Sequence, residues 1–180
     1  MTKILMTGST GDVGSALGDN LIRDRYNIFC LVRGEKTRPQ EIKGDLSNYQ
    51  SLLEATKNIE IVIHAAGLIK GGKKALRIVN IEGTLNLVKA CEENGVKKII
   101  FISSLDVKFN TPYGESKTKA EEIVTHSKLK YVILRPSVIY GKEFKKGIPS
   151  LVKLLKKFPL IPVIGTGENL FQPLYINDLI

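Results

Sequence analysis

Tryptophan is absent from this 180-residue sequence, and cysteine, histidine and methionine each occur only twice. Cys30 and Cys91 lie far apart inside apolar runs and form no CxxC pair, which predicts buried thiols of an intracellular protein and argues against a disulfide framework. His64 and His126 have no Asp, Glu or Cys residues at ligand spacing. We therefore expect no metal site.

Long hydrophobic runs are also lacking. No apolar stretch approaches the roughly 20 residues that a membrane-spanning helix needs. The first residues enter an apolar strand without the pattern of a signal peptide. These absences predict a cytoplasmic protein with no membrane partner. The hydrophobic fraction of 43% is ordinary for a globular protein with its own core.

Acidic residues are few relative to basic ones, and the formal net charge is +9. Such an excess fits either a solvated, lysine-rich surface or an anionic ligand or nucleic acid. Net charge informs association and solubility rather than fold. We favour the solvated surface and expect no nucleic-acid partner.

Strand-like and helix-like segments alternate along most of the chain. The apolar runs that predict strands are residues 3–7, 28–32, 59–66, 98–103 and 131–134, and the segments with helical spacing are residues 13–25, 47–56, 73–94 and 111–127. Ser47 could cap the second helix, and Ile78, Ile81, Leu85 and Val88 would form the apolar stripe of the third. Regular alternation implies right-handed crossovers and a mostly parallel sheet covered on both faces. The fold class is therefore α/β, a doubly wound parallel sheet of the Rossmann type over residues 1–141.

The composition changes after Gly141. Residues 142–157 contain six lysines against one glutamate, and residues 149–158 have the spacing of an amphipathic helix with a lysine-rich back. Prolines and glycines between 159 and 167 predict a loop, and Asp178 would begin another helix. We expect residues 142–180 to be the start of a small substrate-binding region that is truncated.

A glycine-rich turn, Thr7-Gly8-Ser9-Thr10-Gly11-Asp12-Val13-Gly14, joins the first strand to the first helix. Glycines are needed there for the tight bend, for close approach of the pyrophosphate and for close packing of helix on strand. The N-terminus of the helix offers free N–H groups to the anion. In this position the turn predicts dinucleotide binding.

The GxxGxxG spacing of this turn is followed by further motifs in a fixed order. These motifs are Asp45-Leu46, His64-Ala65-Ala66-Gly67, Asn80-Ile81-Glu82-Gly83-Thr84-Leu85-Asn86-Leu87, Ile102-Ser103-Ser104, Tyr113-Gly114-Glu115-Ser116-Lys117 and the segment from Arg135-Pro136 to Tyr140-Gly141. The ordered set resembles the extended short-chain dehydrogenase/reductase family, of the NAD-dependent epimerase/dehydratase type. The resemblance extends over nearly the whole chain.

The resemblance implies a cofactor site made of the glycine turn, an acidic pair at the adenine and the loop after the fourth strand. The candidate cofactor-binding residues are Gly8, Thr10, Gly11, Asp12, Val13, Gly14, Arg33, Asp45, Leu46, Ala65, Ala66, Gly67, Asn80, Tyr113, Lys117 and Pro136. His64 is interpreted as part of the cofactor loop and His126 as a surface residue.

Tyr113 and Lys117 are four residues apart on a predicted helix, so they share one face. A nearby ammonium would lower the pKa of the tyrosine, which could then exchange a proton with substrate while hydride moves to or from the nicotinamide. The resemblance further implies that Lys117 holds the nicotinamide ribose and that Ser104, in preference to Ser103, binds the substrate oxygen. The alternative is that Tyr113 and Lys117 are ordinary residues of an exposed helix end.

The second predicted strand ends in Val32-Arg33, where NAD-preferring relatives usually carry Asp or Glu to bind the ribose hydroxyl. A guanidinium suits a 2′-phosphate, which it binds through two parallel hydrogen bonds. We expect NADP to be preferred over NAD. In the alternative, Arg33 is solvated and the site accepts NAD.

Three functions remain open from the sequence. The first is an NAD(P)-dependent epimerase or dehydratase acting on a nucleotide sugar, and the second is an NADPH-dependent carbonyl reductase of the dihydroflavonol or hydroxysteroid reductase type. The third is a non-catalytic cofactor sensor or assembly subunit, since fold does not fix function. The sequence departs from the family in two places that bear on this choice. Only residues 105–112 separate Ser104 from Tyr113, where relatives usually carry a longer segment that contacts substrate. Relatives also continue well beyond the segment that resembles residues 163–179. A homodimer is compatible with the resemblance, although the sequence does not establish the oligomeric state.

Overall fold

The structure is a computed structural model that describes residues 2–24, 26–142, 144, 147–158, 166, 168 and 170–180. The chain divides into two units, Met1–Arg135 and Pro136–Ile180. No helix among the described residues is long and apolar enough to cross a membrane.

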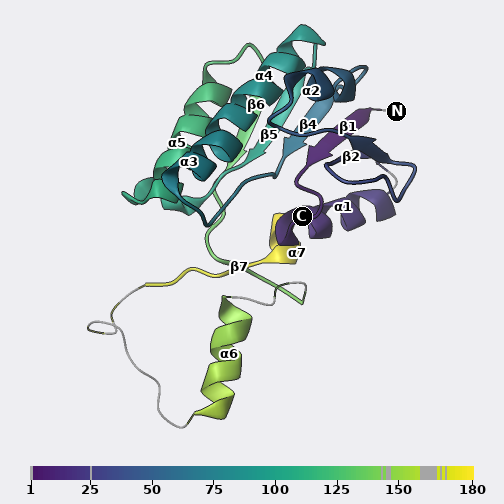
Figure 1. Cartoon of the computed structure of the whole chain (residues 1–180). Helices are drawn as coiled ribbons and strands as arrows, with labels where there is room; N and C mark the ends of the chain where they lie inside the picture. Colours follow the sequence, from purple (N-terminus) through teal and green to yellow (C-terminus); the bar gives the residue numbers. More distant parts are fainter. Residues whose placement is uncertain are drawn as a thin grey trace. The chain divides into compact units, whose positions relative to one another are not determined.

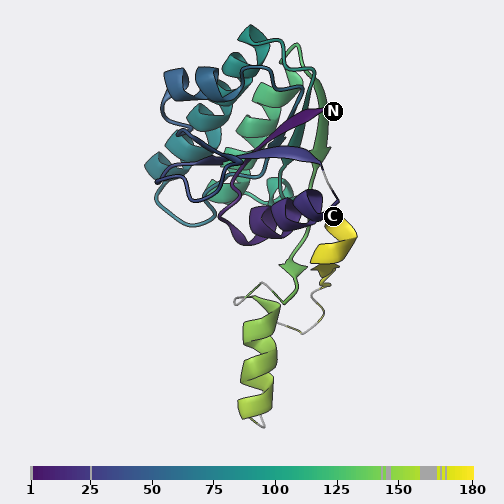
Figure 2. The ribbon, with the colours of Figure 1, turned by 90° about the vertical axis from the view of Figure 1, so that its right-hand side faces the viewer.

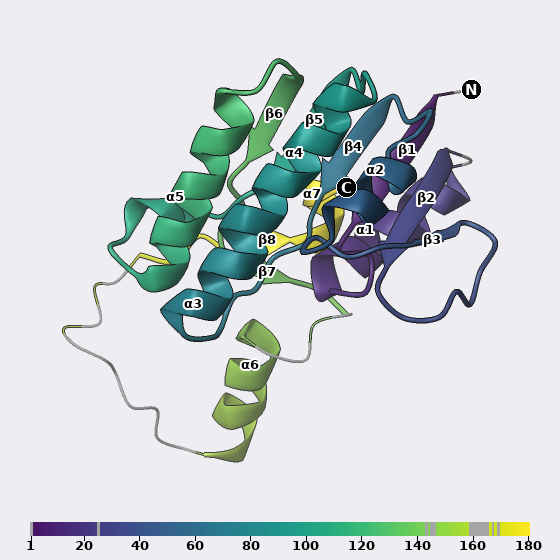
Figure 3. The ribbon, with the colours of Figure 1, turned by 45° about the horizontal axis from the view of Figure 1, so that its top comes forward.

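The first unit is built on a six-stranded parallel sheet with the order β3-β2-β1-β4-β5-β6 (Figure 3). In chain order the strands are β1 (Lys3–Thr7), β2 (Asn27–Val32), β3 (Glu41–Lys43), β4 (Ile61–His64), β5 (Lys98–Ile102) and β6 (Lys130–Leu134). This order confirms the predicted Rossmann-type α/β fold. It reverses between β1 and β4, and ligands of such sheets bind at that point, beyond the carboxyl ends of the strands.

Helices cover both faces of this sheet (Figures 1 and 2). They are α1 (Asp12–Arg23), α2 (Tyr49–Ala55), α3 (Lys73–Leu76), the π-helical turn η1 (Arg77–Glu82), α4 (Gly83–Glu93), the 3₁₀ turn η2 (Leu105–Lys108) and α5 (Pro112–Thr125). One buried apolar cluster joins the sheet to α2, α4 and α5, and a second joins it to α1. These two clusters fix the helices on the two faces of the sheet and so hold the carboxyl ends of its strands in place.

The predicted helix over residues 73–94 contains a π-helical turn at Arg77–Glu82. As a result, the predicted apolar stripe is wrong in part: Ile78 and Leu85 are 38% and 37% exposed, while Leu76 and Leu87 are buried. A π turn takes more residues than an α turn, so one helical period cannot be carried from α3 into α4.

The prediction that Ser47 caps the second helix is also wrong. The N-cap of α2 is Asn48, whose side chain accepts a hydrogen bond from the N–H of Ser51 at 3.0 Å. The Ser47 hydroxyl instead donates to Asp45 Oδ1 at 2.8 Å. A cap residue one position later leaves Ser47 free to hold the carboxylate of Asp45.

The second unit contains a short parallel pair, β7 (Ile139–Tyr140) with β8 (Leu174–Tyr175), and the helices α6 (Ile148–Lys157) and α7 (Ile176–Leu179). The helix expected over residues 149–158 is confirmed as α6. The loop expected between 159 and 167 lies outside the described residues except for Thr166. That residues 142–180 bind substrate stays a prediction.

Candidate functional site

A pocket of about 300 Å³ lies at the carboxyl ends of β1, β2 and β4, where the strand order reverses. Its lining includes the predicted cofactor residues Gly8, Thr10, Gly11, Arg33, Asp45, Leu46, Ala65, Ala66 and Gly67. It also includes residues that the sequence analysis did not assign to the cofactor site, which are Thr7, Leu31, Val32, Gly44, Ser47, Leu68, Ile78 and Val79. Leu31 and Val32 could have been predicted from their position at the end of β2. Ile78 and Val79 could not, because they lie on the π-helical turn, which has no recognisable sequence pattern.

The three glycines of the first turn meet different constraints. Gly8 has φ +79°, and a Cβ atom there would lie 2.5 Å from the nitrogen of Ala66. A Cβ at Gly14 would lie 2.0 Å from the carbonyl oxygen of Gly8. At Gly11 the nearest atom, the same oxygen, is 3.5 Å away, which is an ordinary contact. The fold itself therefore requires Gly8 and Gly14, while Gly11 leaves open space beside the pocket.

Helix α1 begins just past Gly11, and no side chain caps its N-terminus. The N–H groups of the first turn are thus available to an anion, and the helix dipole favours negative charge there. Asp12, Val13 and Gly14 are not among the pocket-lining residues. The arrangement suits a pyrophosphate that binds backbone groups rather than side chains.

Asp45 and Leu46 form another wall of the pocket. The carboxylate of Asp45 accepts hydrogen bonds from the N–H and the hydroxyl of Ser47, both at 2.8 Å, and these bonds hold the pKa of Asp45 below its usual value. The carbonyl of Leu46 accepts a hydrogen bond from Asn86 of α4 at 2.9 Å. A charged acceptor next to the apolar side chains of Leu31 and Leu46 is suited to a flat, amino-bearing ring such as adenine.

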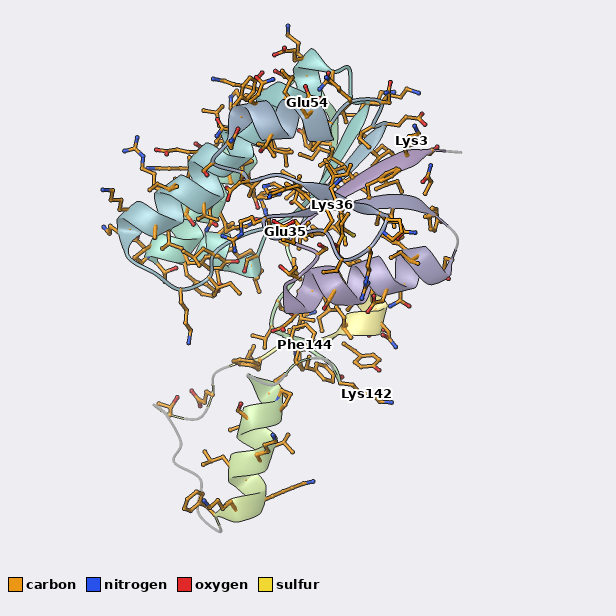
Figure 4. All side chains as sticks on the ribbon, turned by 45° about the vertical axis from the view of Figure 1, so that its right-hand side comes forward. Lys3, Glu35, Lys36, Glu54, Lys142 and Phe144 are labelled. Atoms are coloured by element: carbon orange, nitrogen blue, oxygen red, sulfur yellow. The ribbon has the colours of Figure 1, made fainter. Side chains whose placement is uncertain are left out.

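Arg33 lies at the pocket where β2 has just ended, and its side chain is exposed. Among the described residues it makes no ion pair, whereas its neighbours do: Glu35 pairs with Lys43 at 3.3 Å, and Arg38 with Asp19 at 3.9 Å. Figure 4 shows Glu35 and Lys36 on the segment that follows β2. The guanidinium of Arg33 is therefore available to a ligand in the pocket.

Tyr113 lies in the first turn of α5, which Thr111 caps by accepting a hydrogen bond from the N–H of Gly114 at 3.0 Å. Burial raises the pKa of Tyr113, the neighbouring Ser104 hydroxyl opposes this effect, and the charge of Asp106 adds to it. The expected lowering of the Tyr113 pKa by Lys117 is wrong for this arrangement. The tyrosine keeps its proton at neutral pH.

Ser104 ends the segment after β5 and is the N-cap of η2. Its hydroxyl accepts a hydrogen bond from the N–H of Asp106 and donates one to Asp106 Oδ2, both at 3.1 Å. A Cβ added to Gly114 would lie 2.3 Å from the carbonyl oxygen of Asp106, so α5 packs directly on η2. This close packing brings Ser104 and Tyr113 together although only residues 105–112 separate them.

Lys117 is only 3% exposed, which excludes the alternative that it is an ordinary residue of an exposed helix end. Its Nζ donates to the carbonyl of Ile102 at 2.8 Å and lies 4.0 Å from the centre of the Phe101 ring. A Cβ on Gly67 would be 3.9 Å from the same Nζ. Burial lowers the pKa of Lys117 to about 7. The ammonium group thus lies directly behind the pocket loop.

Asn80 connects this loop to α5. Its side chain accepts from the N–H of Leu68 at 2.7 Å and donates to the Leu68 carbonyl and to the Ser116 hydroxyl, both at 2.9 Å. Asn80 is 2% exposed and lies on the π-helical turn. Turns of this kind are frequent at functional sites. Asn80 holds the pocket loop in place beside the helix that carries Tyr113 and Lys117.

His64 is buried at the end of β4, between Thr7 Oγ1 at 2.7 Å and Thr84 Oγ1 at 3.0 Å. The Thr84 hydroxyl donates its proton to the carbonyl of Asn80, so it accepts from His64 Nε2. Burial lowers the pKa of His64 to about 3, and the ring is therefore neutral. It braces β1 and β4 behind the pocket and is not part of the loop that lines it.

Two further predicted residues lie away from this arrangement. His126 is exposed at the end of α5, as expected. Pro136 belongs to the second unit, so its contact with the cofactor stays a prediction. No group of three or more His, Cys, Asp or Glu side chains in the described part of the chain could hold a metal ion.

Comparison with known proteins agrees with this geometry. The model of the NAD dependent epimerase/dehydratase family matches residues 4–180. UDP-glucose 4-epimerase of Vibrio cholerae is 31% identical over 98% of this chain and 64% of its own length. The 2-alkyl-3-oxoalkanoate reductase of Stenotrophomonas maltophilia is 26% identical over 98% of this chain and 62% of its own length.

Among solved structures, MoeE5 in complex with UDP-glucose and NAD has a TM-score of 0.81 and 25% identity, covering 98% of this chain and 69% of MoeE5. The chain thus spans somewhat less than two thirds of the curated relatives described above. One family model matches nearly the whole chain, and the sheet order and the glycine turn agree with it. The chain therefore belongs to the NAD-dependent epimerase/dehydratase family of the short-chain dehydrogenase/reductase superfamily.

Proposed function

We propose that this protein binds NAD(P) in the pocket at the carboxyl edge of the sheet and transfers hydride to and from a nucleotide sugar, as an epimerase or dehydratase. The observation that carries the proposal is the position of Lys117: its buried ammonium lies against Gly67, on the loop that lines the pocket. A buried lysine is costly unless its charge is used. A bound dinucleotide would supply the hydride acceptor and donor.

The residues around Lys117 have complementary roles in this proposal. Tyr113 keeps its proton at neutral pH, because burial raises its pKa, and can therefore donate it to a carbonyl oxygen of the substrate when hydride is added. In the opposite half of the reaction, its phenolate would accept the proton of the substrate hydroxyl as hydride leaves. Ser104 would donate a hydrogen bond to the same oxygen by turning its single hydroxyl proton from Asp106 Oδ2 to the substrate, while the N–H of Asp106 still holds the hydroxyl oxygen in place. Lys117 would bind the ribose next to the nicotinamide and supply positive charge.

A nucleotide sugar is the proposed substrate because two of the proteins described above are named for UDP-glucose or contain it. We further propose that the protein acts in the cytoplasm, and a homodimer is compatible with the family.

A carbonyl reductase is the second candidate. The observation that favours it is Arg33, which lies exposed at the pocket, makes no ion pair with the described residues and suits the 2′-phosphate of NADPH, the usual reductant of such enzymes. The two functions differ in their net reaction. An epimerase returns the hydride to its substrate, whereas a reductase consumes one NADPH for each product.

The test is incubation of the protein with NAD or NADPH and panels of UDP-sugars and small ketones. We expect a UDP-sugar to be converted to its epimer or dehydration product without net change in the absorbance of the reduced nicotinamide. Steady consumption of NADPH with a ketone would favour the reductase. Tight cofactor binding without turnover of either panel would contradict both and favour the non-catalytic sensor.

The choice of cofactor gives a separate prediction. If Arg33 binds a 2′-phosphate, NADPH should bind more tightly than NADH by about 1–3 kcal/mol, the range of a charge-assisted hydrogen bond. Calorimetry on Arg33→Ala should find most of this difference removed. Arg38→Ala is the matched control, because Arg38 already pairs with Asp19. Equal affinities of the unaltered protein for the two cofactors would exclude the role of Arg33 and leave a site that accepts NAD as readily as NADP.

A further inference from the structure

A buried carboxylate lies one turn after Lys117 on the same face of α5. The side chain of Glu121 is 8% exposed. Residues four apart on a helix lie one above the other, so the two side chains are neighbours. A buried carboxylate is rare unless a partner compensates its charge. Its presence beside a buried ammonium therefore calls for an explanation.

Arg135, the residue that follows β6, holds this carboxylate in a fork. Its Nη2 donates to Glu121 Oε2 at 2.6 Å, and its Nε donates to Oε1 at 2.9 Å and to Oε2 at 3.2 Å. Two-pronged binding of this kind fixes the orientation of a carboxylate as well as its charge. The pKa of Glu121 is lowered accordingly, although burial alone would raise it. Glu121 is therefore a fixed negative charge.

The other groups around Lys117 offer it no negative charge. From β5 it meets the Phe101 ring and the carbonyl of Ile102. From β4 it faces His64, which is neutral at working pH. On its own helix Tyr113 is protonated. Among the described residues, Glu121 is the only group whose charge raises the pKa of Lys117 against the effect of burial.

We propose that Glu121 and Arg135 are positioning residues: the carboxylate, locked by the guanidinium, keeps the buried Lys117 ammonium charged and in place for the cofactor. The role of Lys117 toward the cofactor rests on the proposed function, but the electrostatic coupling of the three side chains does not. Glu121 is not among the residues that line the pocket, so it would act through Lys117. A purely structural ion pair would stabilise the end of β6 against α5 without affecting the protonation of Lys117.

The coupling can be measured without cofactor by following the titration of Lys117 by NMR in protein with ¹³C-labelled lysine, assigned with Lys117→Met. In Glu121→Gln we expect this titration to move to lower pH, because the favourable charge is gone. In Arg135→Gln it should also move to lower pH, because Glu121 loses the guanidinium that keeps it ionised and in place. Glu121→Asp keeps the charge and should restore most of the original titration. Glu122→Gln, on the exposed side of the same helix, is the matched control and should change nothing.

A shift to lower pH in both glutamine variants would support the proposal, and an unchanged titration in both, or a shift to higher pH in Arg135→Gln, would overturn it. Arg135→Gln leaves the sequence of α5 unaltered, so the Lys117 titration in this variant tests the coupling even if Glu121→Gln does not fold. The cofactor is tested next, by NADPH binding as a function of pH. Above the pKa of Lys117, affinity should fall by about tenfold per pH unit, and Glu121→Gln should start this fall at lower pH.

The two steps separate two kinds of failure. If Lys117 titrates as expected but NADPH does not bind, the proposed function is wrong while the coupling stands. If NADPH binds with the same pH profile in Glu121→Gln and in the unaltered protein, the positioning role is wrong while the proposed function stands.

Discussion

Replacement of Tyr113 by phenylalanine is expected to slow hydride transfer by roughly 10²–10⁴-fold, the range typical of a lost general acid or base. The ring and its packing in the first turn of α5 are kept, and only the hydroxyl that would exchange a proton in the proposed reaction is removed. Stability and cofactor affinity should therefore change little. Single-turnover measurement of hydride transfer, with the substrate identified in the UDP-sugar or ketone panel, checks the rate directly.

The matched control is Tyr131→Phe, since Tyr131 is 47% exposed on β6. It loses the same hydroxyl away from the pocket, and its rate should stay within about twofold of the unaltered protein, as surface substitutions usually do. Unimpaired turnover in Tyr113→Phe would show that another group moves the proton. Ser104 and Asp106, which hydrogen-bond each other at 3.1 Å, would then be the next residues to test.

The raised pKa of Tyr113 illustrates what the sequence could not predict. The spacing of Tyr113 and Lys117 placed both on one helical face, and this is what α5 shows. It did not reveal that Lys117 would turn to the carbonyl of Ile102 and lie over Phe101. Those contacts come from β5, which is distant in sequence. The direction of a pKa shift depends on burial and on such distant partners, so helical spacing alone cannot supply it.

Local patterns predicted the fold well where they were long and regular. The alternation of apolar runs and helical segments was enough for the parallel sheet. The missed β3 (Glu41–Lys43) is only three residues long and two of them are charged, so it carries no apolar pattern. The strand pair β7 and β8 has two residues per strand. Elements this short form through their pairing with other strands, and their own sequence gives little signal.

The hydrogen-bond partners of the Asn80 side chain could not be predicted from the sequence either. The resemblance implied a cofactor contact, and the structure gives its side chain three hydrogen bonds to Leu68 and Ser116. An asparagine in a sequence motif does not reveal which of its partners are protein atoms. The π-helical turn, which carries Asn80 and brings Ile78 and Val79 to the pocket, has no established pattern of its own.

The glycine turn gives the second large expected effect, because the structure separates glycines that the sequence treats alike. Gly11→Val should leave the protein folded, since a Cβ at Gly11 meets only an ordinary contact at 3.5 Å. The added side chain would fill the space beside the uncapped N-terminus of α1, where the pyrophosphate is expected. Dinucleotide binding should be abolished, and calorimetry with NADPH and NADH checks this directly.

Gly14→Ala should behave in the opposite way. Its Cβ would lie 2.0 Å from the carbonyl oxygen of Gly8, a backbone atom that cannot move without displacing the turn. We expect a loss of about 1–3 kcal/mol in the free energy of unfolding, as for other overpacked sites, measured by urea denaturation. Gly72→Ala is the control, because a Cβ there meets nothing within 4 Å. If Gly11→Val is as destabilised as Gly14→Ala, the space at Gly11 belongs to the fold and not to a ligand; if Gly11→Val is stable and binds dinucleotide normally, the pyrophosphate does not lie at this turn.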